Sequence, residues 1–338
     1  MKGNERTRNE EDKGGKMISV GKAVKLGGVG KILVQAAIGL IILFAIYLKT
    51  QEYCIAPVFD VFDVLNYPLF FLSALSYFLL NLTLAFRLKK VVEATGCFVG
   101  FKNAVNAHLG GMILSDFTPG RSGYLATPFI LERIGGCDVN KGMAGILVPQ
   151  AIEFLVKIFG AFLGLVFLAA ITEKFREILS FSAIAMALLL FISILIIAGS
   201  WSKFARKIPF PKFIRRRLES YTTQSMKTRN SLRVILSLTL LGWMITAFQW
   251  YFVGMSLSMN LEFFHYLLLQ PLVTLLMFIP LTPAGLGIME GGAVAILYLL
   301  GIDPSTAFFY SILVRLSTLI ADSPGILTIM KVPFKLDF

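Results

Sequence analysis

The chain has 338 residues, of which 56% are hydrophobic and only 15% are charged, and its mean hydropathy is +0.76. This composition excludes a soluble domain, because soluble domains carry about 25% charged residues and cannot hide so much apolar surface from water. The net charge of +12 does not indicate a nucleic-acid partner, because the basic residues gather beside apolar segments. Long, continuous apolar runs predict helices, so we expect an all-α polytopic integral membrane protein.

Residues 1–30 form a basic arm ahead of the first apolar segment. Residues 1–31 contain eight Lys or Arg against four acids, which places the N-terminus in the cytoplasm. The arm shows no small-residue cleavage site before an apolar core. We therefore expect the first span to remain as an anchor of a multi-pass protein of the cytoplasmic membrane.

Six apolar segments approach or exceed the ~20 residues that a membrane-crossing helix needs. They are residues 32–48, 67–86, 143–171, 181–199, 234–259 and 305–330. Arg87, Lys89 and Lys90 close the second segment and predict a cytoplasmic end there. Residues 203–233 hold ten basic residues against the single acid Glu219, the strongest cytoplasmic signal in the chain. Part of this basic segment predicts an amphipathic helix on anionic lipid, with a soluble regulatory partner as the alternative.

Apolar pieces that are too short to span occupy the stretch between the second and third segments. Both flanking segments have their near ends in the cytoplasm, so residues 87–141 must cross the membrane an even number of times. The short pieces at 103–115 and 124–134 therefore predict a re-entrant hairpin, which enters from the cytoplasm and turns at residues 118–123 (TPGRSG).

Residues 263–301 predict a second hairpin, which enters from the outside and turns at residues 282–287 (TPAGLG). Two full crossings would give the same parity and remain the alternative. The last span then returns to the cytoplasm, where Lys331 and Lys335 predict the location of the C-terminus.

The two turns match in their Thr, their Pro and their final Gly. We therefore predict an inverted repeat, with residues 31–171 as the first half and residues 179–330 as the second. Broken helices at corresponding positions of two halves are typical of transporter binding sites, and the N-termini of half-helices suit an anion such as phosphate. The alternative is a pair of ordinary Gly/Pro turns that join helices.

Seven charged residues lie in or beside the apolar segments, where each costs about 2.5–3.5 kcal/mol to insert. They are Asp116, Arg121, Glu153, Lys157, Glu290, Arg315 and Asp322. Glu153 and Lys157 are four residues apart and predict an interior ion pair on one helix face. Arg121 suits bidentate phosphate binding, with a contact to a backbone carbonyl or to headgroups at the surface as its alternative. Glu290 follows the second turn and either compensates a helix dipole or, as we hypothesise, approaches Arg121 at the centre of the repeat.

The cysteines and histidines indicate no special chemistry. Cys54, Cys97 and Cys137 show neither a CxxC motif nor zinc-ligand spacing, and we expect them to be unpaired. His108 and His265 are not at metal-ligand spacing, so we expect them to be packed or interfacial. The sequence thus predicts no metal, no cofactor and no catalytic residues.

The turns also carry a resemblance. The chain resembles, over about residues 30–330, the flippase-type transmembrane domain of lysylphosphatidylglycerol synthetases and of many stand-alone membrane proteins. This sequence matches two motifs of the family, Pro-Gly-Arg-x-Gly-Glu and Pro-x-Gly-x-Gly-x-x-Glu, and its arginine in the last span. The resemblance implies substrate-binding roles for nine residues. These are Pro119, Gly120, Arg121, Gly123, Pro283, Gly285, Gly287, Glu290 and Arg315. Tyr124 stands where many members have Glu, and Thr127 stands near a common second Arg.

The resemblance implies lipid handling, not lysyl transfer, because the soluble aminoacyl-transfer domain is absent from these 338 residues. We expect a translocator of anionic phospholipid or of lipid-linked phosphate, with membrane lipids as its partners. A non-catalytic membrane subunit or scaffold is one alternative. A membrane enzyme acting on a lipid phosphate is the other, although the sequence offers no catalytic constellation. Assembly into a homo-oligomer stays open.

Overall fold

The computed structural model describes residues 33–50, 65–171, 223–224 and 226–332. Within these ranges the regular elements are helices, and five of them are long and apolar enough to cross a membrane. They are Leu33–Thr50, α3 (Tyr67–Ala94), α6 (Val139–Ile171), α10 (Leu232–Ser256) and α13 (Pro304–Asp322). The predicted all-α polytopic membrane fold is confirmed. The predicted span at 181–199 and most of the basic segment at 203–233 lie outside the described residues.

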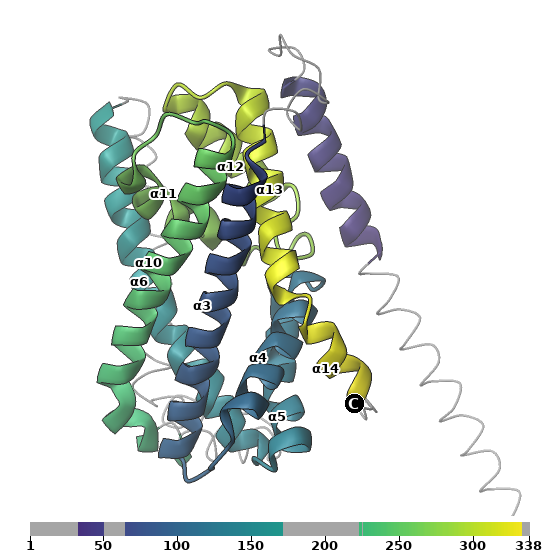
Figure 1. The fold of residues 1–338 in the computed structure, drawn as a ribbon, viewed down its shortest axis with the longest axis vertical. Coiled ribbons are helices and arrows are strands. Elements are labelled where there is room, and N and C mark those ends of the chain that lie inside the picture. Colours follow the sequence, from purple (N-terminus) through teal and green to yellow (C-terminus); the bar gives the residue numbers. More distant parts are fainter. Residues whose placement is uncertain (1–32, 51–64, 172–222, 225, 333–338) are drawn as a thin grey trace, which may run out of the picture.

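Helices α3 and α10 form the central pair and run antiparallel through the full height of the molecule (Figure 1). Asn66 starts α3, since its side-chain oxygen accepts a hydrogen bond from the backbone of Leu69 at 3.2 Å and Pro68 fits the first turn. The Asn66 backbone also donates to the carbonyl of Ser256, which ties the start of α3 to the end of α10. Helix α3 continues to Ala94, two turns beyond its predicted end.

The first hairpin consists of α4 (Phe101–Asp116), the short 3-10 helix η1 (Ser122–Ala126) and α5 (Thr127–Gly135). A helix of 16 residues is about 24 Å long, which is less than the ~30 Å hydrocarbon core of a bilayer. The side chain of Asn103 donates to the Ile134 carbonyl at 2.8 Å, so the hairpin begins and ends at the same level.

A disulfide between Cys97 and Cys137 closes the open end of this hairpin, with 5.8 Å between the two Cα atoms. The prediction that these two cysteines are unpaired is therefore wrong. Their separation of 40 residues carries no pairing signal, because only the return of the chain through the hairpin brings them together. Cys54 lies outside the described residues.

The second hairpin consists of α11 (Phe263–Leu276) and α12 (Ile288–Leu299). Helix α11 is about 21 Å long, again too short to cross a bilayer. The two hairpins enter from opposite ends of the molecule (Figure 1). Both predicted hairpins are thus present, and residues 263–301 do not make two full crossings.

The tips of the two hairpins meet in the middle. The backbone N–H of Ala284 donates to the Thr118 carbonyl at 3.0 Å, and Pro119 pairs with Pro283 in an isolated antiparallel bridge. Irregular backbone at membrane depth needs protein or water around it, and here the turns contact each other while the second turn also packs against Leu33–Thr50.

Each hairpin also packs against the last helix of the other half. Helix α11 packs on α6, while α4 packs on α13 and on α14 (Gly325–Lys331). The contacts are close, because a Cβ on Gly325 would lie 2.2 Å from the Leu109 carbonyl oxygen, and one on Gly164 would lie 2.5 Å from that of Leu268. Glycine permits this approach of two helix backbones. Such reciprocal packing agrees with the predicted inverted repeat, although the predicted last span is divided between α13 and α14.

Candidate functional site

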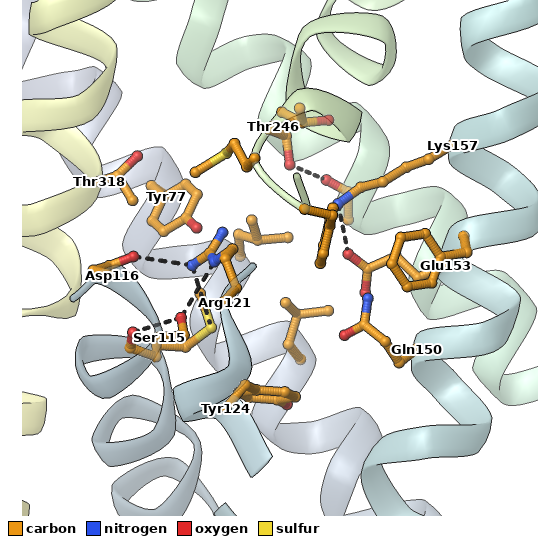
Figure 2. Close-up of a pocket in the computed structure, with 18 of the residues that line it drawn as sticks. Tyr77, Ser115, Asp116, Arg121, Tyr124, Gln150, Glu153, Lys157, Thr246 and Thr318 are labelled. Atoms are coloured by element: carbon orange, nitrogen blue, oxygen red, sulfur yellow. Dashed lines mark hydrogen bonds and ion pairs between the residues drawn. The ribbon is translucent and has the colours of Figure 1, made fainter. Parts of the chain in front are cut away.

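A cavity of about 490 Å³ lies beneath the meeting turns. Helices α3, α4, α6, α10, α11 and α13 supply side chains to its lining, so both halves of the chain enclose it (Figure 2). Its lining is largely apolar but includes four basic and two acidic side chains. These are Arg87, Arg121, Lys157 and Arg315 on the basic side, and Asp116 and Glu153 on the acidic side.

Glu153 on α6 lies between two cations. Its Oε2 atom is 2.9 Å from Nη2 of Arg87, and its Oε1 atom is 2.9 Å from Nζ of Lys157. Arg87 also donates to the Thr239 hydroxyl of α10 at 2.8 Å, and Lys157 lies over the Phe278 ring of the second turn. The predicted Glu153–Lys157 pair is present. Two positive charges against one negative charge leave a surplus of one positive charge at this wall of the cavity.

Arg121 faces this group from the opposite wall, at the tip of the first hairpin (Figure 2). Its backbone has φ 56°, in the left-handed region, which turns the chain and directs the side chain inward. The guanidinium donates to Oγ of Ser115 at 3.2 Å and to Oδ1 of Asp116 at 3.1 Å. The first turn therefore presents a cation whose charge an acid already balances.

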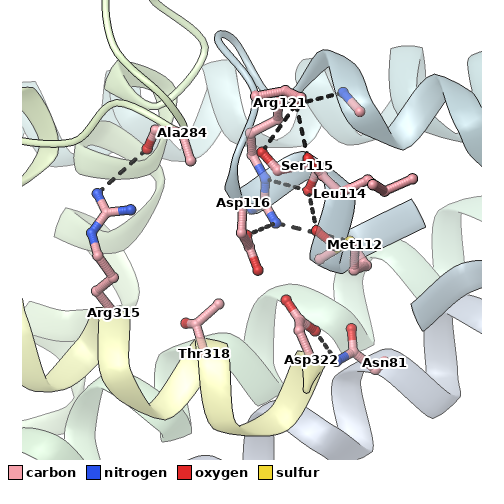
Figure 3. A network of polar contacts seen from close by, with 12 residues as sticks. Asn81, Met112, Leu114, Ser115, Asp116, Arg121, Ala284, Arg315, Thr318 and Asp322 are labelled. Carbon is pink, nitrogen blue, oxygen red and sulfur yellow. Dashed lines mark hydrogen bonds and ion pairs between the residues drawn. The ribbon is translucent and has the colours of Figure 1, made fainter. Parts of the chain in front are cut away.

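Glu290 and Arg315 form a second balanced pair, in the second half of the chain. Glu290 is fully buried, and its Oε1 atom accepts from Nε of Arg315. Its Oε2 atom accepts from the backbone N–H of Gly287 at 2.7 Å, which satisfies a free donor at the start of α12. Arg315 also reaches the Ala284 carbonyl at 3.4 Å (Figure 3). The carboxylate thus compensates the positive end of the α12 dipole, one of its two predicted roles.

Arg121 and Glu290, which we hypothesised to approach each other at the centre of the repeat, have different ion-pair partners. The turns that carry them do meet, but Arg121 pairs with Asp116 and Glu290 pairs with Arg315. Each half supplies its own counter-ion, because an acid from the same half lies closer to each arginine than the acid across the symmetry centre.

The structure separates the nine predicted substrate-binding residues into two groups. Gly120, Arg121 and Arg315 line the cavity. The others do not line it and shape the turns instead; they are Pro119, Gly123, Pro283, Gly285, Gly287 and Glu290.

Sequence reasoning missed two important side chains. Arg87 was assigned to a cytoplasmic span end, whereas it is only 4% exposed and lines the cavity. Asn81 of α3 was not singled out, yet its amide donates to Oδ1 of Asp322 at 2.5 Å. The sequence contained a signal for Asn81, because an Asn within an apolar span needs a polar partner.

His108 is buried, as predicted, and is hydrogen-bonded at both ring nitrogens. Its Nδ1 atom lies 3.0 Å from the Tyr124 hydroxyl, and its Nε2 atom lies 3.2 Å from Oδ1 of Asn81. Tyr124, which replaces the glutamate common in the resembled family, therefore continues a polar chain into the cavity lining. Among the described residues, no group of three or more His, Cys, Asp or Glu side chains could hold a metal ion.

A helical membrane protein with two opposed hairpins and a charged central cavity is the class that the fold and the site define. Comparison with known proteins identifies the family within this class. Residues 32–323 match the family model described as the lysylphosphatidylglycerol synthase TM region, and the chain belongs to that family.

A curated relative is similar over much of the chain. The UPF0104 membrane protein of Methanocaldococcus jannaschii is 28% identical over 214 residues, which cover 61% of this chain and 87% of that protein. No solved structure matches the chain.

Proposed function

We propose that this protein binds the anionic headgroup of a phospholipid, or of a lipid-linked phosphate, in the central cavity and moves the lipid between leaflets. The observation that carries the proposal is the surplus positive charge of the Arg87–Glu153–Lys157 group inside a membrane-embedded cavity. An unbalanced charge at this depth is costly, and an incoming anion removes the cost. Lys157 is the natural contact, because its side chain is 19% exposed and can turn toward a ligand.

The size of the cavity indicates which part of a lipid it takes. About 490 Å³ lies within the range of small-molecule sites, which suits a headgroup with its phosphate. The acyl chains gain nothing by leaving the bilayer, since lipid is as apolar as a protein core. We therefore propose that the headgroup crosses through the protein while the chains stay in lipid.

The pattern of basic residues along the sequence supports one orientation of the protein in the membrane. We propose that the protein lies in the cytoplasmic membrane with both termini in the cytoplasm, so that the open end of the first hairpin faces the cytoplasm and that of the second faces outward.

Leaflet exchange of fluorescent phospholipids in proteoliposomes tests the proposal. The wild type is compared with Lys157→Met, which removes the surplus charge, and with Lys102→Met, which changes an exposed lysine outside the cavity. We expect the wild type and Lys102→Met to accelerate exchange of an anionic probe, and Lys157→Met to lose at least about tenfold, the equivalent of 1.4 kcal/mol.

Three outcomes contradict the proposal. Equal exchange by the two lysine variants would remove the cavity from the pathway. No protein-dependent exchange of anionic or zwitterionic probes by folded protein would favour a scaffold. A covalently altered lipid in the recovered vesicles would indicate an enzyme.

A further inference from the structure

Asp116 and Asp322 form a pair of buried carboxylates that the roles above do not use. They come from the ends of α4 and α13, one from each half of the chain, and they point into the same interior space (Figure 3). The Asp116 side chain is 4% exposed and Asp322 is fully buried. In Figure 3 the Asp116 and Asp322 carboxyl groups lie on facing sides of this space.

The hydrogen bonding of the pair is incomplete in a specific way. Oδ1 of Asp116 accepts from Arg121, and Oδ1 of Asp322 accepts from Asn81. The Oδ2 atom of each carboxyl group is buried and has no hydrogen-bond donor among the residues that the structure describes. Two adjacent carboxylates offer only acceptors to each other, so a proton between them is the donor that this arrangement lacks.

The charges around the pair point the same way. Arg121 is the cation in contact with Asp116, and Tyr77 of α3 lines the cavity beside them (Figure 2). Arg315 acts on Asp116 from α13 but is already balanced by Glu290. Two carboxylates and one arginine carry a net charge of −1, whereas one added proton makes the cluster neutral. A buried carboxylate without a partner in contact is strongly disfavoured, and the surplus positive charge of the Arg87–Glu153–Lys157 group lies on the opposite wall of the cavity.

We propose that Asp116 and Asp322 share one proton in the empty protein and take up a second proton when an anionic headgroup binds Arg121. This inference rests on the proposed function, and it adds the coupling ion. The balance is simple. The headgroup first meets Lys157 and then moves across the cavity to Arg121. There its phosphate replaces Asp116 as the partner of Arg121, so Asp116 loses its counter-charge and is neutralised by a proton from water. The cluster is neutral before and after binding, and the headgroup crosses together with one proton.

A route for that proton is present in the same cluster. Asp322 is hydrogen-bonded to Asn81, Asn81 to His108, and His108 to Tyr124, whose side chain lines the cavity. The groups that face the pair, directly or through this chain, are thus Arg121, Arg315, Tyr77, His108 and Tyr124. The chain links the buried carboxyl group to the space that the headgroup would occupy.

The first test needs no ligand. Infrared spectroscopy of the purified protein reports protonated carboxyl groups by their C=O stretch, which shifts in D₂O. We expect such a band in the wild type and its loss in both Asp116→Asn and Asp322→Asn, because one remaining carboxylate is balanced by Arg121 alone. The matched control Asp138→Asn, at an exposed site outside the cavity, should keep the band. Absence of the band in the wild type, or its survival in both single variants, overturns the shared proton.

The second test measures proton uptake on binding. Titration calorimetry with dihexanoyl phosphatidylglycerol, in buffers of different ionisation enthalpy, gives the number of protons bound per probe. We expect about one for the wild type and for either single variant, and about zero for the double variant Asp116→Asn/Asp322→Asn. The results of this titration distinguish a failure of the proton coupling from a failure of the proposed lipid translocation.

Binding with no proton uptake in the wild type would refute the coupling while leaving the proposed function intact. Uptake that persists in the double variant would also refute it. Failure of the probe to bind would count against the proposed function, and with it against proton uptake on headgroup binding. The infrared result would still decide whether Asp116 and Asp322 share a proton. Glycerol phosphate, titrated in parallel, shows whether a free phosphate suffices or a lipid is required.

Discussion

The ion pair between Glu290 and Arg315 offers a direct test of how the second hairpin is held. We expect Glu290→Gln to keep the hydrogen bond from Gly287, since an amide oxygen still accepts it, but to leave Arg315 without its counter-charge. Breaking a buried ion pair on one side costs about 3–5 kcal/mol. A chain of 338 residues has an unfolding entropy of roughly 0.7 kcal/mol per degree, so Tm should fall by about 4–7 °C.

The assay is thermal unfolding in detergent, followed by the intrinsic fluorescence of the three tryptophans. Glu132→Gln makes the same change at an exposed position on α5 and should leave Tm unchanged. The double variant Glu290→Gln/Arg315→Met should be more stable than Arg315→Met alone, which leaves a buried carboxylate unpaired. Equal Tm values for Glu290→Gln and Glu132→Gln, or a double variant no more stable than Arg315→Met, would refute the reasoning.

Two further predictions concern packing and the disulfide. Gly325→Ala should lower stability by about 3 kcal/mol, measured as a lower Tm, because the added Cβ would lie 2.2 Å from the Leu109 carbonyl oxygen. The control is Gly100→Ala, whose Cβ would have no neighbour within 4 Å. Equal Tm values for the two variants would contradict this packing. Because both cysteines are buried, labelling is done in denaturing detergent, where Cys97 and Cys137 should resist maleimide until a reductant is added. Cys97→Ser should lose up to about 4 kcal/mol of stability, the chain-entropy value for a loop of 40 residues. Immediate labelling of both thiols would show that the bond is absent.

The disulfide also bears on the predicted topology. It closes the end of the first hairpin that we propose to face the cytoplasm, where thiols are ordinarily kept reduced. Labelling with a membrane-impermeant maleimide after reduction, in sealed vesicles of known orientation, should show on which side this end lies.

The sequence by itself determined the class of protein and its main irregularities. Continuous apolar runs need no partner to be recognised, because the solvent they require is lipid. The hairpin turns at 118–123 and 282–287 were equally visible, since Pro and Gly interrupt apolar pieces too short to span. The Glu153–Lys157 pair was predictable because residues four apart on a helix are neighbours whatever surrounds them.

The tertiary structure alone decided the partners between helices. Arg121 pairs with Asp116, not with Glu290, and Asp116 faces the same interior space as Asp322 from the other half of the chain. Arg87, which looked like an anchor at a span end, lines the cavity because α3 continues past it to Ala94. Such pairings depend on the depth and rotation of each helix, and these are set by contacts between residues far apart in the sequence. Periodicity records only which face of a helix a residue occupies, and the packing of the whole bundle determines what that face meets.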